Sequence, residues 1–140
     1  MKEPTKIFFD TAPIIYYIED NQTFASKVEK LLEKFEKQKL MINSIVYTEL
    51  CIKPKRENNK QLIFLFDDFL NNLRFEILTI DKKCAIIAID LMAKYQQIKT
   101  VDAIHIASAI AHNCDTFVTN DKQLKQIKEI NILVLSEIEN

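Results

Sequence analysis

Short apolar runs alternate with longer amphipathic stretches along this chain. Runs of four or five mainly β-branched, aromatic or aliphatic residues, bounded by polar turns, predict β-strands. Five such runs occur, at Lys6–Asp10, Leu40–Asn43, Phe75–Thr79, Thr116–Thr119 and Ile132–Leu135. Their nearly continuous apolar character is typical of strands that are covered on both faces of a parallel sheet.

Apolar residues three or four positions apart predict the helices between these runs. The predicted helices lie from Thr11 to Asp20, at Thr23–Gln38, from Ile45 to about Lys53, at Gln61–Leu70, from Asp81 to about Tyr95 and from Thr100 onward, with a short helical turn after Asp121. Ser44 is expected to cap the third helix and Pro54 to end it, because proline has no N–H to donate. Strands alternating with helices predict one α/β domain over residues 1–140.

The helix that begins at Thr100 has an unusual composition. It reads T-V-D-A-I-H-I-A-S and is apolar on almost every side, which predicts burial at the centre of the fold. Thr100 stands where a helix cap is expected, and Asp102 lies in the first turn, where unpaired N–H groups stabilise a carboxylate. Asp102 is therefore either a simple helix-start acid or an anionic ligand at the mouth of a buried helix.

Composition restricts the classes of function. The 140 residues carry a net charge of −1 and include no glycine. Phosphate-binding loops of the P-loop and dinucleotide-binding kinds need glycine, so both are excluded as motifs. Three cysteines without a C-x-x-C pair favour reduced thiols and a cytoplasmic location, and we identify no signal peptide or membrane span.

Four acids stand at positions that can converge. Asp10 and Asp121 follow predicted strands, Glu49 lies on the helix after the second strand, and Asp102 opens the buried helix. They meet if the first, second and fourth strands are neighbours, because ligands of parallel sheets bind at the carboxyl ends of the strands. Crowded carboxylates repel one another unless they are protonated or bridged, and oxygen ligands without His or Cys suit Mg²⁺ or Mn²⁺. The alternatives are a turn acid at Asp10, a surface acid at Glu49 and a helix-start acid at Asp121.

The order and spacing of four motifs resemble a known family. The motifs are F-F-D-T, S-x-x-x-x-E, T-V-D-A-I-H-I-A-S-A-I and F-V-T-N-D, and together they span nearly the whole chain. They resemble the PIN-domain ribonucleases, in particular the VapC-type toxins of bacterial toxin–antitoxin pairs. The resemblance implies a three-layer α/β/α fold with a central parallel sheet of four to five strands. One departure is Asn113, which stands where the family often has glycine and which tolerates the same left-handed conformation.

The resemblance also implies an activity and a site. Asp10, Glu49, Asp102 and Asp121 match the acids that bind Mg²⁺ or Mn²⁺ and hydrolyse RNA phosphodiester bonds, leaving a 5′-phosphate and a 3′-hydroxyl. Thr11 and Thr119 match supporting hydroxyl residues, and Asn120 lies beside the last acid. The implied partners are an RNA substrate, a cognate antitoxin and a second copy of the chain.

Two other functions are compatible with the residues. The chain could be a different Mg²⁺-dependent phosphate-processing α/β enzyme, although the D-x-D of a haloacid-dehalogenase-type phosphatase is missing after the first strand, where Ala12 stands. It could also be a non-catalytic PIN-like domain that binds RNA or protein. His105 lies one helical turn after Asp102, and burial in the core is a simpler interpretation of this residue than catalysis.

Overall fold

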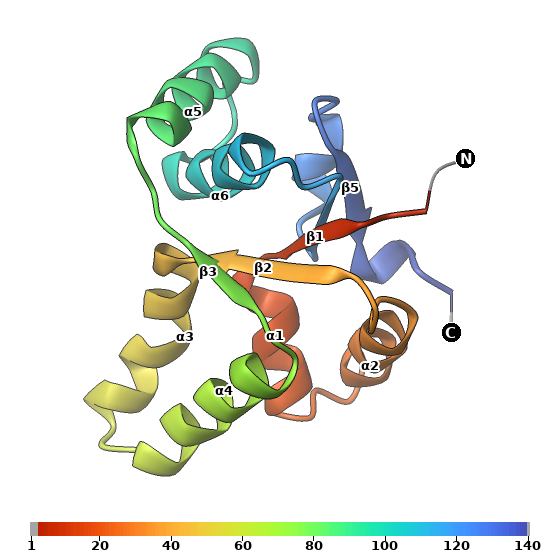
Figure 1. The fold of residues 1–140 in the computed structure, drawn as a ribbon, viewed down its shortest axis with the longest axis vertical. Helices are drawn as coiled ribbons and strands as arrows, with labels where there is room; N and C mark the ends of the chain where they lie inside the picture. The colour runs from red at the N-terminus through yellow and green to blue at the C-terminus, as the bar shows by residue number, and fades with distance from the viewer. Residues whose placement is uncertain (1–2, 140) are drawn as a thin grey trace.

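A computed structural model describes residues 3–139 of the chain. Its five strands form one parallel sheet in the order β3-β2-β1-β4-β5 (Figure 1). The elements in chain order are β1 (Lys6–Phe9), α1 (Thr11–Ile18), α2 (Ala25–Lys34), β2 (Lys39–Asn43), α3 (Ser44–Arg56), α4 (Lys60–Asn72), β3 (Glu76–Leu78), α5 (Lys82–Lys94), α6 (Thr100–Ala111), β4 (Thr116–Thr119), the 3-10 helix η1 (Lys122–Gln126), β5 (Asn131–Val134) and the 3-10 helix η2 (Leu135–Glu137).

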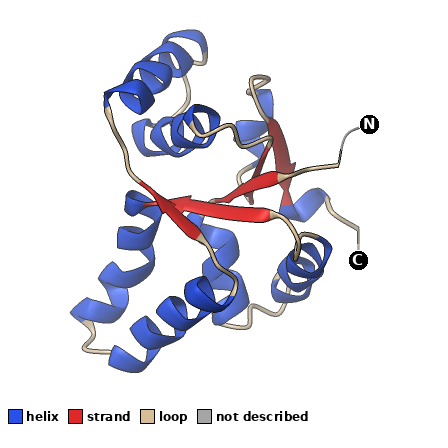
Figure 2. Cartoon of the chain, in the orientation of Figure 1, coloured by secondary structure: helices blue, strands red, loops and turns tan. Residues whose placement is uncertain are grey.

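The sheet lies between two groups of helices. Helices α5 and α6 cover one face, and α1 to α4 cover the other (Figure 2). This arrangement confirms the predicted three-layer α/β/α fold, and the parallel sheet expected to have four to five strands has five. No helix within residues 3–139 has the length and apolar character needed to cross a membrane.

The core lies on both faces of the three middle strands. Phe8 of β1 pairs in register with Phe117 of β4, and their rings stack with centroids 5.3 Å apart. Both side chains are completely buried, as are Ile106 and Ala107 of α6. Burial of aromatic rings contributes much of the free energy that fixes such a core. These contacts place the middle strands at the centre of the core.

Three details of the helix ends differ from the sequence-based expectations. Asn43, not Ser44, caps α3, since its side chain accepts from the Val46 N–H. Helix α3 continues through Pro54 to Arg56, because the missing N–H lies in the last turn and affects only one hydrogen bond there. The N-cap of α6 is Lys99, and Thr100 is already helical.

Four helices end in the same way. Asp20, Asn58, Arg74 and Asn113 each follow a C-cap with a positive φ of 53–63°. The N–H of the next residue then donates to a carbonyl five positions back, as in Asn21 to Tyr16, Asn59 to Pro54, Phe75 to Leu70 and Cys114 to Ala109. This geometry usually employs glycine, which the chain lacks. The left-handed conformation expected for Asn113 is confirmed.

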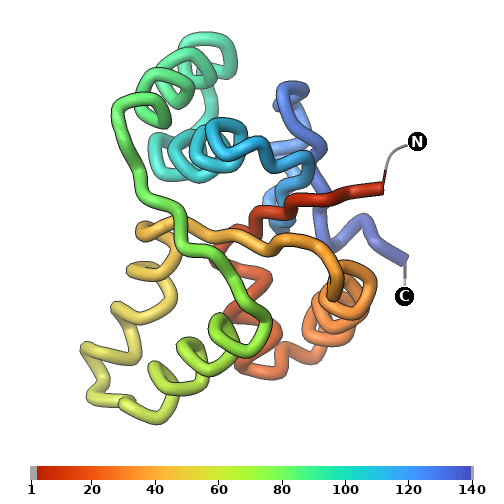
Figure 3. The backbone as a smooth tube through the Cα atoms, in the orientation of Figure 1, coloured from red at the N-terminus to blue at the C-terminus, as the bar shows by residue number. Residues whose placement is uncertain are grey.

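The continuous backbone trace shows how distant segments meet (Figure 3). Strand β1 runs between β2 and β4, so the first, second and fourth strands are neighbours, which is the condition for the predicted acids to converge. Their carboxyl ends lead to Asp10, to Asn43 and to Thr119. Parallel pairing therefore brings the start of α1, the start of α3 and the β4–η1 turn to one edge of the sheet.

Candidate acidic site

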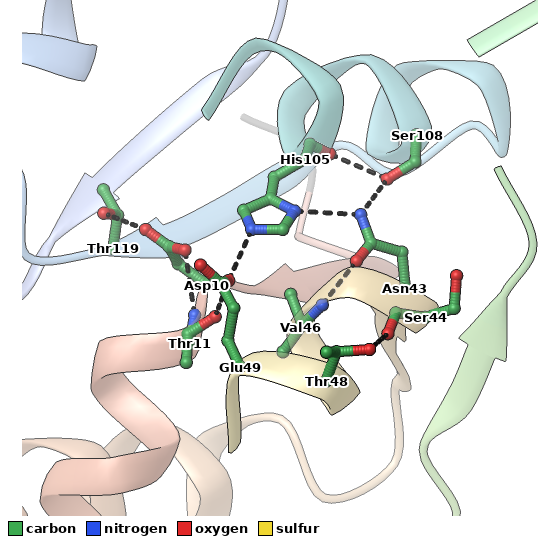
Figure 4. Close-up of polar contacts among 10 residues, drawn as sticks. All are labelled: Asp10, Thr11, Asn43, Ser44, Val46, Thr48, Glu49, His105, Ser108 and Thr119. Atoms are coloured by element: carbon green, nitrogen blue, oxygen red, sulfur yellow. Dashed lines mark hydrogen bonds and ion pairs between the residues drawn. The ribbon is translucent and has the colours of Figure 1, made fainter. Parts of the chain in front are cut away.

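Asp10 occupies the centre of this edge. It caps α1, with Oδ1 accepting from the Thr11 N–H at 2.8 Å, while Oδ2 accepts from the Thr119 hydroxyl at 2.8 Å (Figure 4). The Asp10 N–H donates to the carbonyl of Val118 at 2.8 Å. Backbone and side-chain bonds thus fix the carboxylate between β1 and β4.

Asp121 lines one pocket with Asp102 and a second pocket with Asp10. Asp102 is in the first turn of α6, and Asp121 caps η1 by accepting from the Gln123 N–H. Both line one pocket, whose other residues are Gln97, Ile98, Lys99, Gln123, Leu124 and Gln126. Burial raises the pKa of Asp102, and repulsion from Asp10 and then Asp121 raises it further. These three acids therefore share one electrostatic environment.

Burial also raises the pKa of Asp10. His105 and the hydrogen bonds from Thr119 and Thr11 oppose this shift, whereas the charge of Glu49 adds to it. A carboxylate that is both desolvated and close to other acids favours either a proton or a cation. Within residues 3–139 no lysine, arginine or histidine forms an ion pair with Asp10, so its carboxylate charge is open to compensation by a cation.

Glu49 projects from α3 toward the same centre. Its Oε1 accepts from the Thr11 hydroxyl at 2.6 Å and lies 2.9 Å from Nε2 of His105, as Figure 4 shows. The Glu49 side chain is 41% exposed, whereas the His105 side chain is 1% exposed. Glu49 is thus an accessible carboxylate whose orientation is set by a buried ring of α6.

The three supporting residues take different places. Thr119 donates to Asp10 and accepts from the Asp121 N–H at 3.1 Å, so one hydroxyl connects two of the acids. Thr11 connects Asp10 and Glu49 through its N–H and hydroxyl. Asn120 lines a shallow pocket with Asp10 and Asp121, but its side-chain oxygen accepts from the Ser136 N–H and joins η2 to the β4 turn.

The predicted acids have the type of ligand atom that a hard divalent cation binds. All four predicted acids offer carboxylate oxygens, which Mg²⁺ and Mn²⁺ prefer. Within residues 3–139, however, no three His, Cys, Asp or Glu side chains come close enough together to hold a metal ion. Mg²⁺ commonly uses one or two carboxylates and keeps several waters, so it does not require three carboxylates in direct contact with it.

The sequence patterns did not predict the buried polar residues on the core side of Glu49. Asn43 and Ser108 are completely buried, and the amide nitrogen of Asn43 lies 3.0 Å from both Nδ1 of His105 and the Ser108 hydroxyl. His105 is buried, as expected, but it also contacts an acid of the site. The available signal was the helical spacing that puts Asp102, His105 and Ser108 in successive turns near one face of α6.

Comparisons with known proteins identify the family of the fold. A model of the PIN domain matches residues 7–130. No curated protein matches the sequence. The chain is similar to one from VapBC2 of Rickettsia felis, solved with a promoter DNA fragment, with 26% identity, a TM-score of 0.80 and coverage of 93% of this chain and 98% of that one.

More distant structures share the fold. A chain of VapBC-1 from nontypeable Haemophilus influenzae is 19% identical, with a TM-score of 0.71 and coverage of 95% of this chain and 100% of that one. A chain of FitAcB from Neisseria gonorrhoeae is 19% identical, with a TM-score of 0.72 and coverage of 94% and 99%. The family model spans most of the chain, and the resemblance stated from the motifs is confirmed. The chain therefore belongs to the PIN-domain family.

Proposed function

We propose that this chain is a metal-dependent endoribonuclease and the toxin of a type II toxin–antitoxin pair. The observation that carries the proposal is the placement of three acids at the carboxyl edge of a PIN-domain sheet, where Asp121 lines one pocket with Asp102 and a second with Asp10. Mutual repulsion among neighbouring acids destabilises the fold unless a cation or a proton compensates it. Such an arrangement is typical of a site built for a metal rather than for stability.

In this proposal Asp10, Glu49, Asp102 and Asp121 would hold Mg²⁺ or Mn²⁺, one or two of them by direct bonds and the others through the waters that such an ion keeps. A bound ion of this kind supplies a water of lowered pKa and compensates the charge of a phosphate during displacement. The chain's own groups orient the acids: Thr119 holds Asp10, and Thr11 holds Glu49. Lys53 lines the same pocket as Glu49, where its ammonium group can contact an RNA phosphate.

The proposed partners follow from the family and from the similar structures. Those structures include complexes described as toxin–antitoxin or VapBC assemblies, so we propose a cognate antitoxin that binds this chain. We also propose a homodimer that acts in the cytoplasm. RNA is the proposed substrate, because the resemblance of the motifs is to ribonucleases.

The test is cleavage of total cellular RNA by the purified chain. Reactions contain Mg²⁺, Mn²⁺ or EDTA and compare wild type with Asp102→Asn. Asp90→Asn is the matched control, since Asp90 is an exposed acid of α5 that undergoes the same change in charge far from the β-strand ends. We expect discrete fragments with wild type and Asp90→Asn, and none with EDTA or Asp102→Asn.

Two results would contradict the proposal. Equal cleavage by wild type and Asp102→Asn would assign the activity to a contaminant. Mn²⁺ binding without cleavage of any cellular RNA would favour the non-catalytic binding function instead.

A further inference from the structure

A buried hydrogen-bond network lies on the core side of Glu49. We propose that His105 is a positioning residue, which holds the Glu49 carboxylate through a hydrogen on Nε2 that Asn43 fixes in place. The inference rests on the proposed function, because it concerns how one of the proposed metal ligands is oriented. It assigns a role to a ring that neither the motifs nor the comparisons assign.

The orientation of the Asn43 amide is determined by a backbone group. The Val46 N–H can only donate, and it lies 2.8 Å from Oδ1 of Asn43 at the start of α3. The oxygen of the amide therefore faces Val46, and its NH₂ group faces α6. A flipped amide would place two donors against each other at a completely buried position.

Both hydrogens of this NH₂ group have acceptors. Ser108 donates its hydroxyl to the carbonyl of His105 at 2.9 Å, so its oxygen is free to accept from Asn43 at 3.0 Å. The second hydrogen points to Nδ1 of His105, also at 3.0 Å. Nδ1 is consequently an acceptor, and the ring carries its hydrogen on Nε2.

The Nε2 hydrogen points out of the core toward Glu49. Nε2 lies 2.9 Å from Oε1, and the Thr11 hydroxyl donates to the same oxygen at 2.6 Å. Within residues 3–139 no group donates to Oε2. One carboxylate oxygen is thus occupied by two fixed donors, and the other remains available, as is typical of the outer-shell bonds that orient a metal ligand. Figure 4 shows the whole path from Val46 through Asn43 and His105 to Glu49.

The experiment compares His105→Leu with His105→Gln in the full chain. Leucine removes the donor at similar size, whereas the longer glutamine amide can return an N–H close to the place of Nε2. We measure the Mn²⁺ dissociation constant by calorimetry, RNA cleavage and the melting temperature. We expect His105→Leu to weaken Mn²⁺ binding roughly 10-fold or more, as loss of an outer-shell bond does, and His105→Gln to recover most of it.

His112 provides the matched control. It is the second of two histidines, and it lies on α6 with Nδ1 bonded to the carbonyl of Ser108 rather than to an acid. His112→Leu should bind Mn²⁺ like wild type. It also leaves His105 as the single imidazole, whose ¹⁵N spectrum we expect to show the hydrogen on Nε2 and an unprotonated Nδ1.

A double variant tests whether His105 acts through Glu49. We expect Glu49→Gln with His105→Leu to bind Mn²⁺ no more weakly than Glu49→Gln alone, since coupled residues are not additive. Should His105→Leu fail to fold, His105→Asn replaces it, because the shorter amide can satisfy Asn43 but cannot reach Glu49.

Several outcomes overturn the inference. If folded His105→Leu binds Mn²⁺ with wild-type affinity, His105 serves only in core packing, even if the melting temperature of the variant is lower. Equal losses in His105→Gln and His105→Leu, additive losses in the double variant, or a hydrogen on Nδ1 would each refute the donor role. Failure of wild type itself to bind Mn²⁺ or cleave RNA would instead refute the proposed function, and this inference with it.

Discussion

Replacing Asn43 with alanine is expected to destabilise the chain far more than loss of a helix cap alone. The side chain is completely buried and makes three hydrogen bonds, to Val46, His105 and Ser108. Loss of the cap costs about 1 kcal/mol. Each of the other two bonds contributes roughly 1 kcal/mol, because its removal leaves a buried polar partner unsatisfied.

The expected total is about 3 kcal/mol of unfolding free energy. An unfolding entropy of about 2.1 cal/mol/K per residue converts this loss into a fall of roughly 10 °C in the melting temperature for a 140-residue chain. Urea unfolding followed by circular dichroism measures the free energy, and an unchanged m-value shows that the same transition is compared.

Asn59→Ala isolates the contribution of a cap. Asn59 caps α4 with one bond, to the Leu62 N–H at 3.0 Å, and it is exposed. We expect a loss of about 1 kcal/mol for this variant. If the two alanine variants lost similar free energies, the network around His105 would contribute nothing and the reasoning would be refuted.

Two further predictions concern charge and reactivity. Burial and the nearby acids raise the pKa of Asp102 above its ordinary 3.8, so the folded chain holds this proton more tightly than the unfolded chain does. The protonated carboxyl group therefore favours folding at low pH, and this contribution is lost as the pH rises through the pKa of the folded state. Asp102→Asn should therefore have a higher melting temperature than wild type at about pH 7 in EDTA, and the same melting temperature below about pH 3.8. Scanning calorimetry measures both values across this range. Equal melting temperatures of the two proteins at every pH would contradict the prediction. Burial raises the pKa of Cys114 to about 12, so its native thiol should resist alkylation at pH 8 and react in urea, and rapid native labelling detected by mass spectrometry would contradict this.

The sequence was most informative where the geometry of parallel strands decides the outcome. Apolar runs located all five strands to within one or two residues, and Asp10 and Asp121 followed from where strands end. The start of a buried helix located Asp102 in the same way. These features depend on the order of apolar and polar residues over a few neighbouring positions, which can be read from one sequence.

The helix ends and the His105 network depended on contacts that pattern does not display. Ser44 and Asn43 are both good capping residues, and only the register of β2 decides that Asn43 takes this place. The contact between His105 and Glu49 joins residues 56 positions apart, so it exists only once α3 and α6 are placed against the sheet. Whether the four acids bind a metal stays a prediction.

The four left-handed helix ends have a consequence for the unfolded chain. An L-residue in this conformation costs up to about 1–2 kcal/mol that glycine would avoid, and the cost is smaller for Asn and Asp, whose short polar side chains tolerate it. A chain without glycine has fewer backbone conformations to lose on folding. Each position at which another residue replaces glycine without strain stabilises the folded protein by about 0.4–1 kcal/mol for this reason. At average usage of about 7%, roughly ten positions of a 140-residue chain would be glycine, so the two effects are of similar size. This protein accepts strain at Asp20, Asn58, Arg74 and Asn113 in the folded state, and it gains in return a less disordered ensemble from which to fold.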